Sequence, residues 1–222
     1  MNDPRVSRPF RLRARGPLAC FTRPEMKAER VSYEVMTPSA ARGLLEAILW
    51  KPAIRWQIHR IAVLAPIQWT SVRRNEVNDK QSLRGGTFYA DERRSQRATI
   101  ALRNVDYLVE ATFRLTDQAA EGDTRPKFEA MFERRLVQGQ HFHQPYLGCR
   151  EFAADIEPAP ETFQPIDPGV NRPLGLMFYD FEYGPNRGDP AERPLFFEAR
   201  LNGGVLEVPD IAEVKAQNGG PA

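Results

Sequence analysis

Two histidines one residue apart are the clearest candidates for proton-transfer chemistry in this chain. His141 and His143 lie in the segment 140–144, and histidine is the side chain that changes charge near neutral pH. Either residue can therefore act as a general acid or base, although alternating histidines are more often exposed loop residues. We expect no metal site here, because the sequence offers no third ligand at a suitable spacing.

The basic residues are concentrated in the first half of the chain. Residues 1–103 contain 20 Lys and Arg against 9 Asp and Glu, whereas residues 104–222 contain 11 against 20, giving a net charge of +2. A basic half that faces a polyanion is typical of nucleic-acid-binding proteins. We therefore expect these arginines to form one continuous cationic surface. The alternative is that they are dispersed, solvated surface residues.

Composition argues against several other classes of protein for this chain. Hydrophobic residues make up 41% of the 222 residues and charged residues 27%, which is ordinary for a globular protein. No apolar run approaches the roughly 18 residues that cross a bilayer, and the N-terminus lacks a signal-peptide core, so we expect a cytoplasmic protein with no membrane contact. Cys20 and Cys149 are too far apart for a zinc site or a disulfide framework and are expected to be reduced, partly buried thiols.

Hydrophobic periodicity predicts the elements that position these residues. The segment 10–15 alternates apolar and basic residues, so it predicts a strand with its arginines on one face. Ser39 is the expected N-cap of a helix that Pro52 ends. In the segment 98–115, alternate apolar residues from Val105 to Phe113 predict a strand with one buried face. The expected strands are 10–15, 53–67, 68–77, 98–115, 146–152, 174–181, 195–201 and 205–208, and the expected helices are 39–52 and 126–139.

The order strand, helix, strand, strand, helix, strand predicts an α+β fold of the ferredoxin-like type, which RNA-recognition modules also use. We expect this domain to span residues 8–157, with a mobile insertion at 79–96. The segment 158–210, which is broken by proline and glycine, predicts a small antiparallel β-rich domain. Residues 211–222 are expected to be a frayed tail.

Seven short motifs occur in the order and spacing of one known family. Together they resemble the Cas-five proteins of subtype d from type I-C (Dvulg) CRISPR systems, in the RAMP superfamily, over about Phe10 to Pro209. The motifs are Phe21 to Lys27 with Ser32-Tyr33, Pro38 to Gly43, Trp50-Lys51-Pro52, Arg73 to Val77, Leu102 to Tyr107, Gln144 to Phe152, and Leu174-Gly175.

The resemblance implies an endoribonuclease that cuts the CRISPR repeat without a metal or other cofactor. The nucleophile is then the 2′-hydroxyl of the RNA, so the protein must move protons and stabilise the charged phosphorane. The family places catalytic groups just before the Trp-Lys-Pro motif and in a Lys-His pair that begins the second helix. This chain has Leu49 and Phe128 at two of those three positions, and only Lys127 matches. Lys127 can clamp a phosphate, or it can be a solvated surface residue.

The candidate catalytic residues are therefore Lys127, His141, His143 and Tyr33, which occupies a family position. Trp50, Trp56 and Trp69 can serve as platforms for bases but are more often core residues, and His59 is expected to be structural. Arg103 and Arg150 can bind RNA or can pair with Asp106 and Glu151. The candidate RNA-binding residues are Arg23, Lys27, Arg30, Arg73, Arg74, Asn75, Arg97, Arg103 and Arg150.

Three hypotheses follow from these observations. The first is a repeat-specific endoribonuclease that stays on the 5′ tag of its product within the type I-C interference complex, Cascade. The second is a scaffold subunit that binds the tag and cuts poorly or not at all, as Leu49 and Phe128 suggest. The third is a generic RNA-recognition module. The partners that the resemblance implies are CRISPR repeat RNA, the backbone and large subunits of the complex, and target DNA near the PAM.

Overall fold

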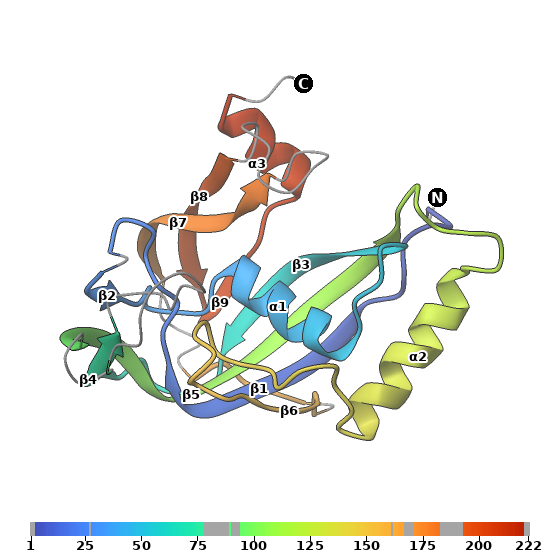
Figure 1. Ribbon diagram of the computed structural model, residues 1–222. Coiled ribbons are helices and arrows are strands. Elements are labelled where there is room, and N and C mark those ends of the chain that lie inside the picture. The colour runs from blue at the N-terminus through green and yellow to red at the C-terminus, as the bar shows by residue number, and fades with distance from the viewer. Residues whose placement is uncertain are drawn as a thin grey trace.

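The computed structural model describes residues 3–26, 28–77, 89, 94–160, 162–166, 171–182 and 193–219. The strands are β1 (Phe10–Ala19), β2 (Arg30–Val31), β3 (Ile54–Val63), β4 (Trp69–Val77), β5 (Arg94–Leu115), β6 (Asp155–Pro158), β7 (Arg172–Glu182), β8 (Arg193–Asn202) and β9 (Val205–Glu207). The helices are α1 (Pro38–Ile48), α2 (Arg125–Val137) and α3 (Ile211–Gln217). The described strands form one mostly antiparallel sheet in the order β6-β1-β5-β3-β9-β8-β7, and β2 and β4 also pair with β5 (Figure 1).

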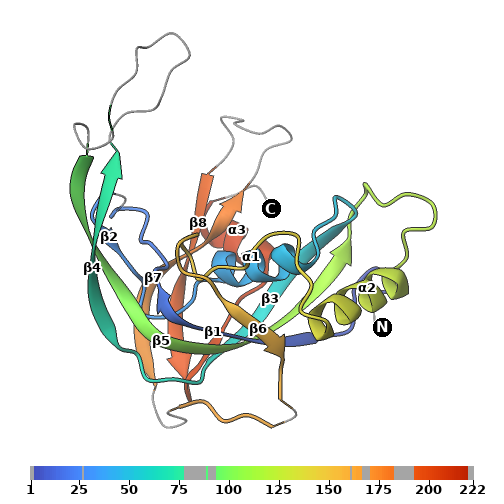
Figure 2. The ribbon, with the colours of Figure 1, turned by 60° about the horizontal axis from the view of Figure 1, so that its bottom comes forward.

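The central strand β5 organises the sheet. Its C-terminal part pairs antiparallel with β1 and with β3, and its N-terminal part pairs with β4. The predicted alternation is confirmed, because the apolar residues from Val105 to Phe113 on one face are buried. Figure 2 shows β4 and the first part of β5 extending as a two-stranded ribbon from the rest of the sheet.

Helices α1 and α2 pack against the same face of the sheet through aromatic contacts. Trp56 on β3 is buried, its indole N–H donates to the carbonyl of Leu49 at the end of α1 (3.0 Å), and its ring centre lies 4.7 Å from that of Phe132 on α2. Phe10 on β1 also contacts Phe132, at 4.9 Å between ring centres. The core of the molecule therefore lies between these two helices and β1, β3 and β5.

The first helix begins slightly earlier than the sequence predicted. Thr37 rather than Ser39 is the N-cap, since its hydroxyl accepts a hydrogen bond from the amide of Ala40 (3.3 Å). Pro38 lacks an N–H and fits the first helical position, which places the cap just before it. The helix ends at Ile48, before Pro52, because Leu49 adopts an extended backbone.

The prediction of a strand over 146–152 is wrong. This segment forms turns held by an isolated bridge between Tyr146 and Ala153. Gly148 in the turn has a positive φ of 82°, which a strand does not accommodate. A strand that the sequence did not predict, β6, follows directly and pairs antiparallel with β1.

The C-terminal strands continue the same sheet. β9 pairs with both β8 and β3, and β7 pairs with β8. Where the sequence predicted a frayed tail from residue 211, α3 forms instead, because Asp210 caps it (2.8 Å to the amide of Ala212) and Val214 is fully buried. Most of the predicted insertion at 79–96 lies outside the described residues, and its last three residues begin β5. Among the described helices, none has the length and apolar character needed to cross a membrane.

Candidate functional site

Tyr33 and Arg23 form a cation–π contact beside the first loop, which joins β1 to β2 (residues 20–29). The guanidinium of Arg23 lies 4.4 Å from the centre of the Tyr33 ring, and Tyr33 is only 1% exposed. Its hydroxyl accepts a hydrogen bond from the amide of Phe178 on β7 (3.1 Å). Burial raises the pKa of Tyr33, so its hydroxyl is a poor general base, and its visible role is to join this loop to β7. Lys27, in the same loop, lies outside the described residues.

Three of the predicted RNA-binding arginines share two carboxylates. Glu151 accepts hydrogen bonds from Arg30 (3.1 Å) and Arg74 (3.0 Å). Glu76 pairs with Arg74 at 2.9 Å and more distantly with Arg30 (3.7 Å) and Arg97 (3.8 Å). With three arginines and two carboxylates, these five residues have a net charge of +1. Their ion pairs hold the first loop against β4, β5 and the 146–153 turn.

The two cysteines lie beside this cluster as buried, free thiols. The Cys149 sulfur is 3.3 Å from Nη1 of Arg30 and 3.5 Å from the carbonyl oxygen of Cys20. A hydrogen bond from the Cys20 thiol lowers the pKa of Cys149 to about 6; burial opposes this shift and the Arg30 charge adds to it. Cys149 therefore helps to hold Arg30 through its sulfur.

Four other predicted RNA-binding residues are open to solvent. Arg73 and Asn75 project from the uncovered face of the β4–β5 ribbon, and Arg103 and Arg150 are also exposed. None of these three arginines forms an ion pair within the described part of the chain. The pairs considered for Arg103 and Arg150 are therefore not formed: Asp106 pairs with Arg13 at 2.5 Å, and Glu151 pairs with Arg30 and Arg74.

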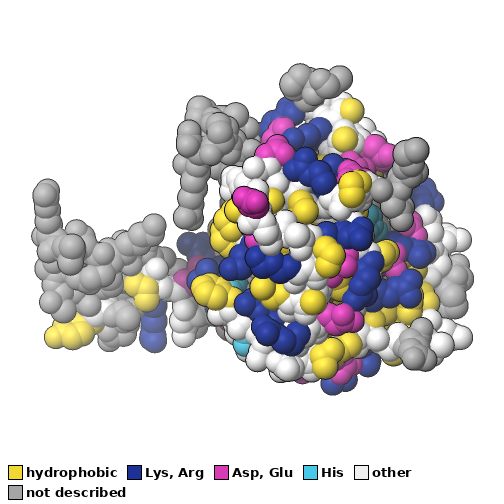
Figure 3. Space-filling view, turned by 90° about the vertical axis from the view of Figure 1, so that its right-hand side faces the viewer, with side chains coloured by type: hydrophobic (Ala, Val, Ile, Leu, Met, Phe, Trp, Pro, Cys, Tyr) yellow, Lys and Arg dark blue, Asp and Glu magenta, His cyan; other side chains and the backbone are white. Residues whose placement is uncertain are grey.

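The expectation that the arginines of the first half form one continuous cationic surface is wrong. Folding pairs many of them with acids of the second half, as Arg11 with Glu110 (2.6 Å) and Arg60 with Glu207 (2.9 Å) illustrate. Figure 3 shows a face on which Lys and Arg side chains are interspersed with Asp and Glu. The charge asymmetry along the chain thus reflects intramolecular pairing as well as binding capacity. Further pairs of this kind are Arg5–Asp117, Arg8–Glu133, Arg13–Asp106, Arg13–Glu157 and Arg42–Asp180.

Two of the three tryptophans expected in the core are on the surface. Trp50 is 60% exposed and Trp69 is 44% exposed, whereas Trp56 is 4% exposed. Trp50 follows the end of α1, where the chain turns outward, and Trp69 lies on the uncovered face of the ribbon. Both indoles are therefore available to stack on bases. His59, expected to be structural, hydrogen-bonds to Thr112 on β5 (2.8 Å).

Lys127 lies on the first turn of α2 and is already paired. Its ammonium donates to Asp123 (2.9 Å), and that hydrogen bond lowers the pKa of Asp123. Leu49 and Phe128, which replace the expected catalytic groups, are buried in the core, so no titratable group stands at either position. The α-helical rise separates Lys127 from Val137, at the other end of α2, by about 15 Å.

His141 and His143 follow that far end of α2. His141 lines a cavity of about 520 Å³ between the ends of α1 and α2 and the edge strand β6. His143 is exposed, and its ring stacks at 6.1 Å on that of Tyr146. Lys127 therefore lies at the opposite end of α2 from the two histidines. Tyr33 lies in another part of the fold, against β7.

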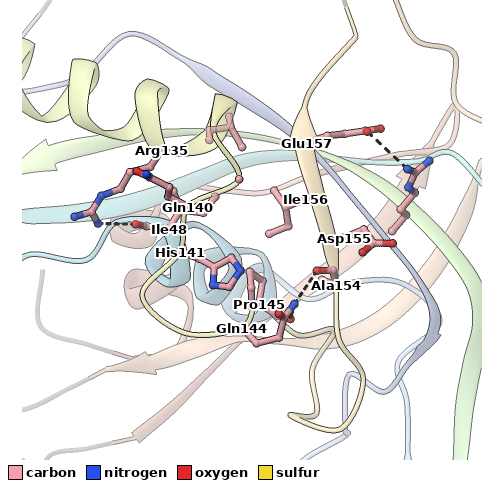
Figure 4. A pocket seen from close by; sticks show the side chains of 13 residues that line it. Ile48, Arg135, Gln140, His141, Gln144, Pro145, Ala154, Asp155, Ile156 and Glu157 are labelled. Atoms are coloured by element: carbon pink, nitrogen blue, oxygen red, sulfur yellow. Dashed lines mark hydrogen bonds and ion pairs between the residues drawn. The ribbon is translucent and has the colours of Figure 1, made fainter.

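The cavity is lined by polar and charged side chains together with a smaller area of apolar surface (Figure 4). Ile156 of β6 points toward His141, whereas Asp155 and Glu157 project from the other side of that strand. Sequence reasoning did not find this cavity, because β6 is short and carries no clear alternation. The residues that line it are Arg15, Ile48, Arg135, Leu136, Gly139, Gln140, His141, Gln144, Pro145, Ala154, Asp155, Ile156 and Glu157.

Comparison with known proteins gives consistent matches over nearly the whole chain. Residues 10–209 match the Cas5d family model, described as a CRISPR-associated protein of the Cas5 group. Two curated relatives carry the name CRISPR pre-crRNA endoribonuclease Cas5d. The one from Mannheimia succiniciproducens is 43% identical over 90% of this chain and 94% of its own length. The one from Thermus thermophilus is 45% identical over 87% of this chain and 88% of its own length.

Solved structures show the same fold. A crystal structure of a CRISPR-associated protein matches with a TM-score of 0.72 and 25% identity, covering 96% of this chain and 97% of that one. A functionally uncharacterized protein from Streptococcus mutans also gives a TM-score of 0.72, at 23% identity, covering 96% of this chain and 98% of its own.

Proposed function

The chain belongs to the Cas5d family of CRISPR-associated proteins, and on that premise we propose that it cuts the repeat of precursor CRISPR RNA and stays on the 5′ tag of its product. The observation that carries the proposal is identity of 43% and 45% with two pre-crRNA endoribonucleases over most of the chain. Membership of the type I-C interference complex is part of the same proposal. Its partners there are the backbone and large subunits, with target DNA near the PAM.

The proposed RNA-binding surface combines open and paired arginines. Arg73, Asn75, Arg103 and Arg150 are exposed and can contact RNA as they stand. The paired arginines can contact phosphates if RNA displaces their carboxylates, a cost that is modest for pairs near the surface. These paired residues are Arg23, Arg30, Arg74 and Arg97; Lys27, outside the described residues, completes the set.

The proposed reaction is metal-independent attack by a 2′-hydroxyl of the RNA on the adjacent phosphate. His141 and His143 are the groups proposed for proton transfer, because an imidazole nitrogen can accept or donate a proton. The buried Tyr33 and the paired Lys127 need rearrangement to take part. Lys127 is better placed to hold a phosphate at the other end of α2.

A scaffold that binds the tag without cutting is the second candidate function. It is favoured by Leu49 and Phe128, which place buried apolar side chains where the family resemblance leads us to expect catalytic groups. The names of the two curated relatives favour cleavage instead. The two candidates therefore differ only in whether the repeat is cut.

We also propose that residues 8–157 form a ferredoxin-like core and residues 158–210 a small β-rich domain. The antiparallel order β6-β1-β5-β3 supports this proposal, together with α1 lying between β1 and β3 and α2 between β5 and β6 in the chain. The β7–β8 hairpin joins that core through β9.

A cleavage assay in EDTA tests the function. Purified protein is incubated with a labelled transcript of the CRISPR repeat from the same genome, and we expect one discrete product whose downstream fragment begins with a 5′-hydroxyl. A 2′-deoxy substitution at the cut should abolish the product while binding persists. Tight binding with no product would establish the scaffold function, and the absence of both would reject the family function for this chain. The variants His141→Ala and His143→Ala then show which histidine the reaction needs.

A further inference from the structure

The cavity beside His141 has the size and the chemistry of a site for one nucleobase. Its volume of about 520 Å³ falls within the range of roughly 300–1,000 Å³ typical of small-ligand sites. Ile156, with the small exposed parts of Ile48, Leu136 and Pro145, provides apolar surface for one face of a ring. This surface comes from three separate elements, so the cavity exists only in the folded chain.

Polar groups around the cavity match the edge of a base. Gln140 and Gln144 each carry an amide, which offers both donors and an acceptor. The Gln144 amide nitrogen donates to the carbonyls of Ala154 (3.3 Å) and Pro145 (3.4 Å). Its orientation is thereby fixed, and its oxygen remains as an acceptor for a ring or exocyclic N–H.

The loop that carries these groups is held in place by backbone hydrogen bonds. The amide of Gln140 donates to the carbonyl of Arg135 (2.8 Å), and the amide of Phe142 donates to the carbonyl of Ala47 in α1 (2.7 Å). The amide of Ala154 closes the other side by donating to the carbonyl of Pro145 (2.9 Å). The cavity is therefore formed before a ligand arrives, which reduces the entropic cost of binding.

The cavity carries charges of both signs, Arg15 and Arg135 beside Asp155 and Glu157, and aromatic rings lie near it. Arg135 uses Nη1 to donate to the carbonyl of Ile48 (2.8 Å) and has further N–H groups for a phosphate. Outside the cavity, Phe142 is 88% exposed and the His143 ring stacks on Tyr146. Exposed aromatic rings beside a basic group are the usual platform for bases of single-stranded RNA.

We propose that this cavity binds one unpaired base of the repeat RNA, with the His141 ring against the base and the Gln140 and Gln144 amides at its edge. The inference rests on the proposed function, because it assumes that the chain binds RNA. It adds a specificity site to that function. Arg73, Arg103 and Arg150 contact a backbone common to every RNA, whereas this cavity distinguishes one nucleotide position.

An abasic scan of the repeat tests the proposal. Each position of a cleavage-blocked repeat, carrying a 2′-deoxy at the cut, is replaced in turn by an abasic nucleotide, and dissociation constants are measured by anisotropy. For the wild-type chain one unpaired position should weaken binding by about tenfold, the scale of one stacked base. His141→Ala, Gln144→Ala and the cavity-filling Ile156→Phe should each weaken binding to the intact repeat and remove the penalty at that same position.

Gln118→Ala is the matched control, because Gln118 is exposed and lies before α2, away from the cavity; it should keep the wild-type profile. A thermal melt of each variant checks that it folds. If one of the three variants fails to fold, the other two still test the proposal. The proposal is overturned if the variants bind the RNA with the wild-type abasic profile, or if every position loses affinity equally. If the wild-type chain binds no repeat RNA, the proposed function fails first and this inference with it.

Discussion

The sulfur of Cys149 lies 3.3 Å from Nη1 of Arg30, whose guanidinium also donates to Glu151 at 3.1 Å. One arginine thus joins the 146–153 turn to the first loop through a sulfur and a carboxylate. Arg30 is among the residues proposed to bind RNA, so the protonation of Cys149 is linked to the position of an arginine in the proposed RNA-binding surface.

This coupling predicts a stability that depends on pH. The pKa of Cys149 falls from the ordinary 9.0 to about 6 in the folded chain, so the folded state binds fewer protons than the unfolded state between those values. Stability from this group is therefore present at high pH and is lost as the pH falls through about 6. Between pH 5.5 and 8 we expect the wild type to gain about 2 kcal/mol over Cys149→Ser, or about 4–8 °C in Tm.

Thermal melts of both proteins at several pH values measure the effect. The range stops at pH 8 because the Cys20 pKa is raised, and that group lowers the stability once the pH passes its unfolded value near 9. Arg30→Gln should reduce the pH dependence in the same way. A Tm difference between wild type and Cys149→Ser that stays constant with pH would show that Cys149 remains a thiol.

Gly148 is predicted to be irreplaceable in the turn that carries Cys149. A Cβ at this position would lie 2.1 Å from the carbonyl oxygen of Cys20, and its φ of 82° is unfavourable for other residues. Gly148→Ala should therefore destabilise the fold by about 3 kcal/mol or more. Gly43→Ala in α1 is the control, because nothing lies within 4 Å of a Cβ there, and it should stabilise by about 0.5–1 kcal/mol. Denaturant unfolding of both variants gives the comparison; a neutral Gly148→Ala would mean that the turn can move away from Cys20.

Periodicity and residue composition in the sequence were sufficient for the main strands and helices. Alternate apolar residues predicted β1 and β5, and a run rich in Ile, Val and Trp predicted β3. Apolar residues at helical spacing predicted α1 and α2, because such a pattern reflects one buried face. The residue at which a helix begins was harder to predict. Thr37 and Ser39 are both good caps, and only the position of Pro38 within the first turn decides between them.

Ion pairs between segments that are distant in the sequence could not be predicted from periodicity. The alternation in β1 places Arg11, Arg13 and Arg15 on one face, but it does not say that β5 and β6 will bring carboxylates to that face. The cavity was missed for the same reason, because it needs the ends of α1 and α2 to meet β6. Lys127 was proposed from a family motif and the two histidines from their residue type, whereas their separation along α2 appears only in the fold.

The paired and open arginines should respond differently to substitution. Arg13 donates to Asp106 and Glu157, so Arg13→Ala leaves the mostly buried Asp106 carboxylate without that partner and should cost about 1–3 kcal/mol of stability. Arg73 has an exposed side chain on the ribbon, so Arg73→Ala should leave the Tm unchanged and weaken RNA binding. The slope of log affinity against log salt should fall by about 0.7 for Arg73→Ala only. Titrations at several salt concentrations measure that slope, and an equal loss of slope in Arg13→Ala would place β1 in the RNA interface.

Substitutions of Lys127 and of Asp123, which form an ion pair, should have opposite effects on the affinity for RNA. Because the carboxylate holds the ammonium at 2.9 Å, RNA must compete with Asp123 for Lys127. Lys127→Ala should therefore weaken binding to the cleavage-blocked repeat by about threefold, and Asp123→Asn should strengthen it by a similar factor. The substituted amide would keep an oxygen for the backbone N–H of Ala120, from which Asp123 accepts at 3.2 Å, so the loop should stay intact. The rate of cutting at saturating protein should change less than the affinity in both variants. A loss confined to that rate in Lys127→Ala would instead give Lys127 a direct part in catalysis and move the reacting phosphate to this end of α2.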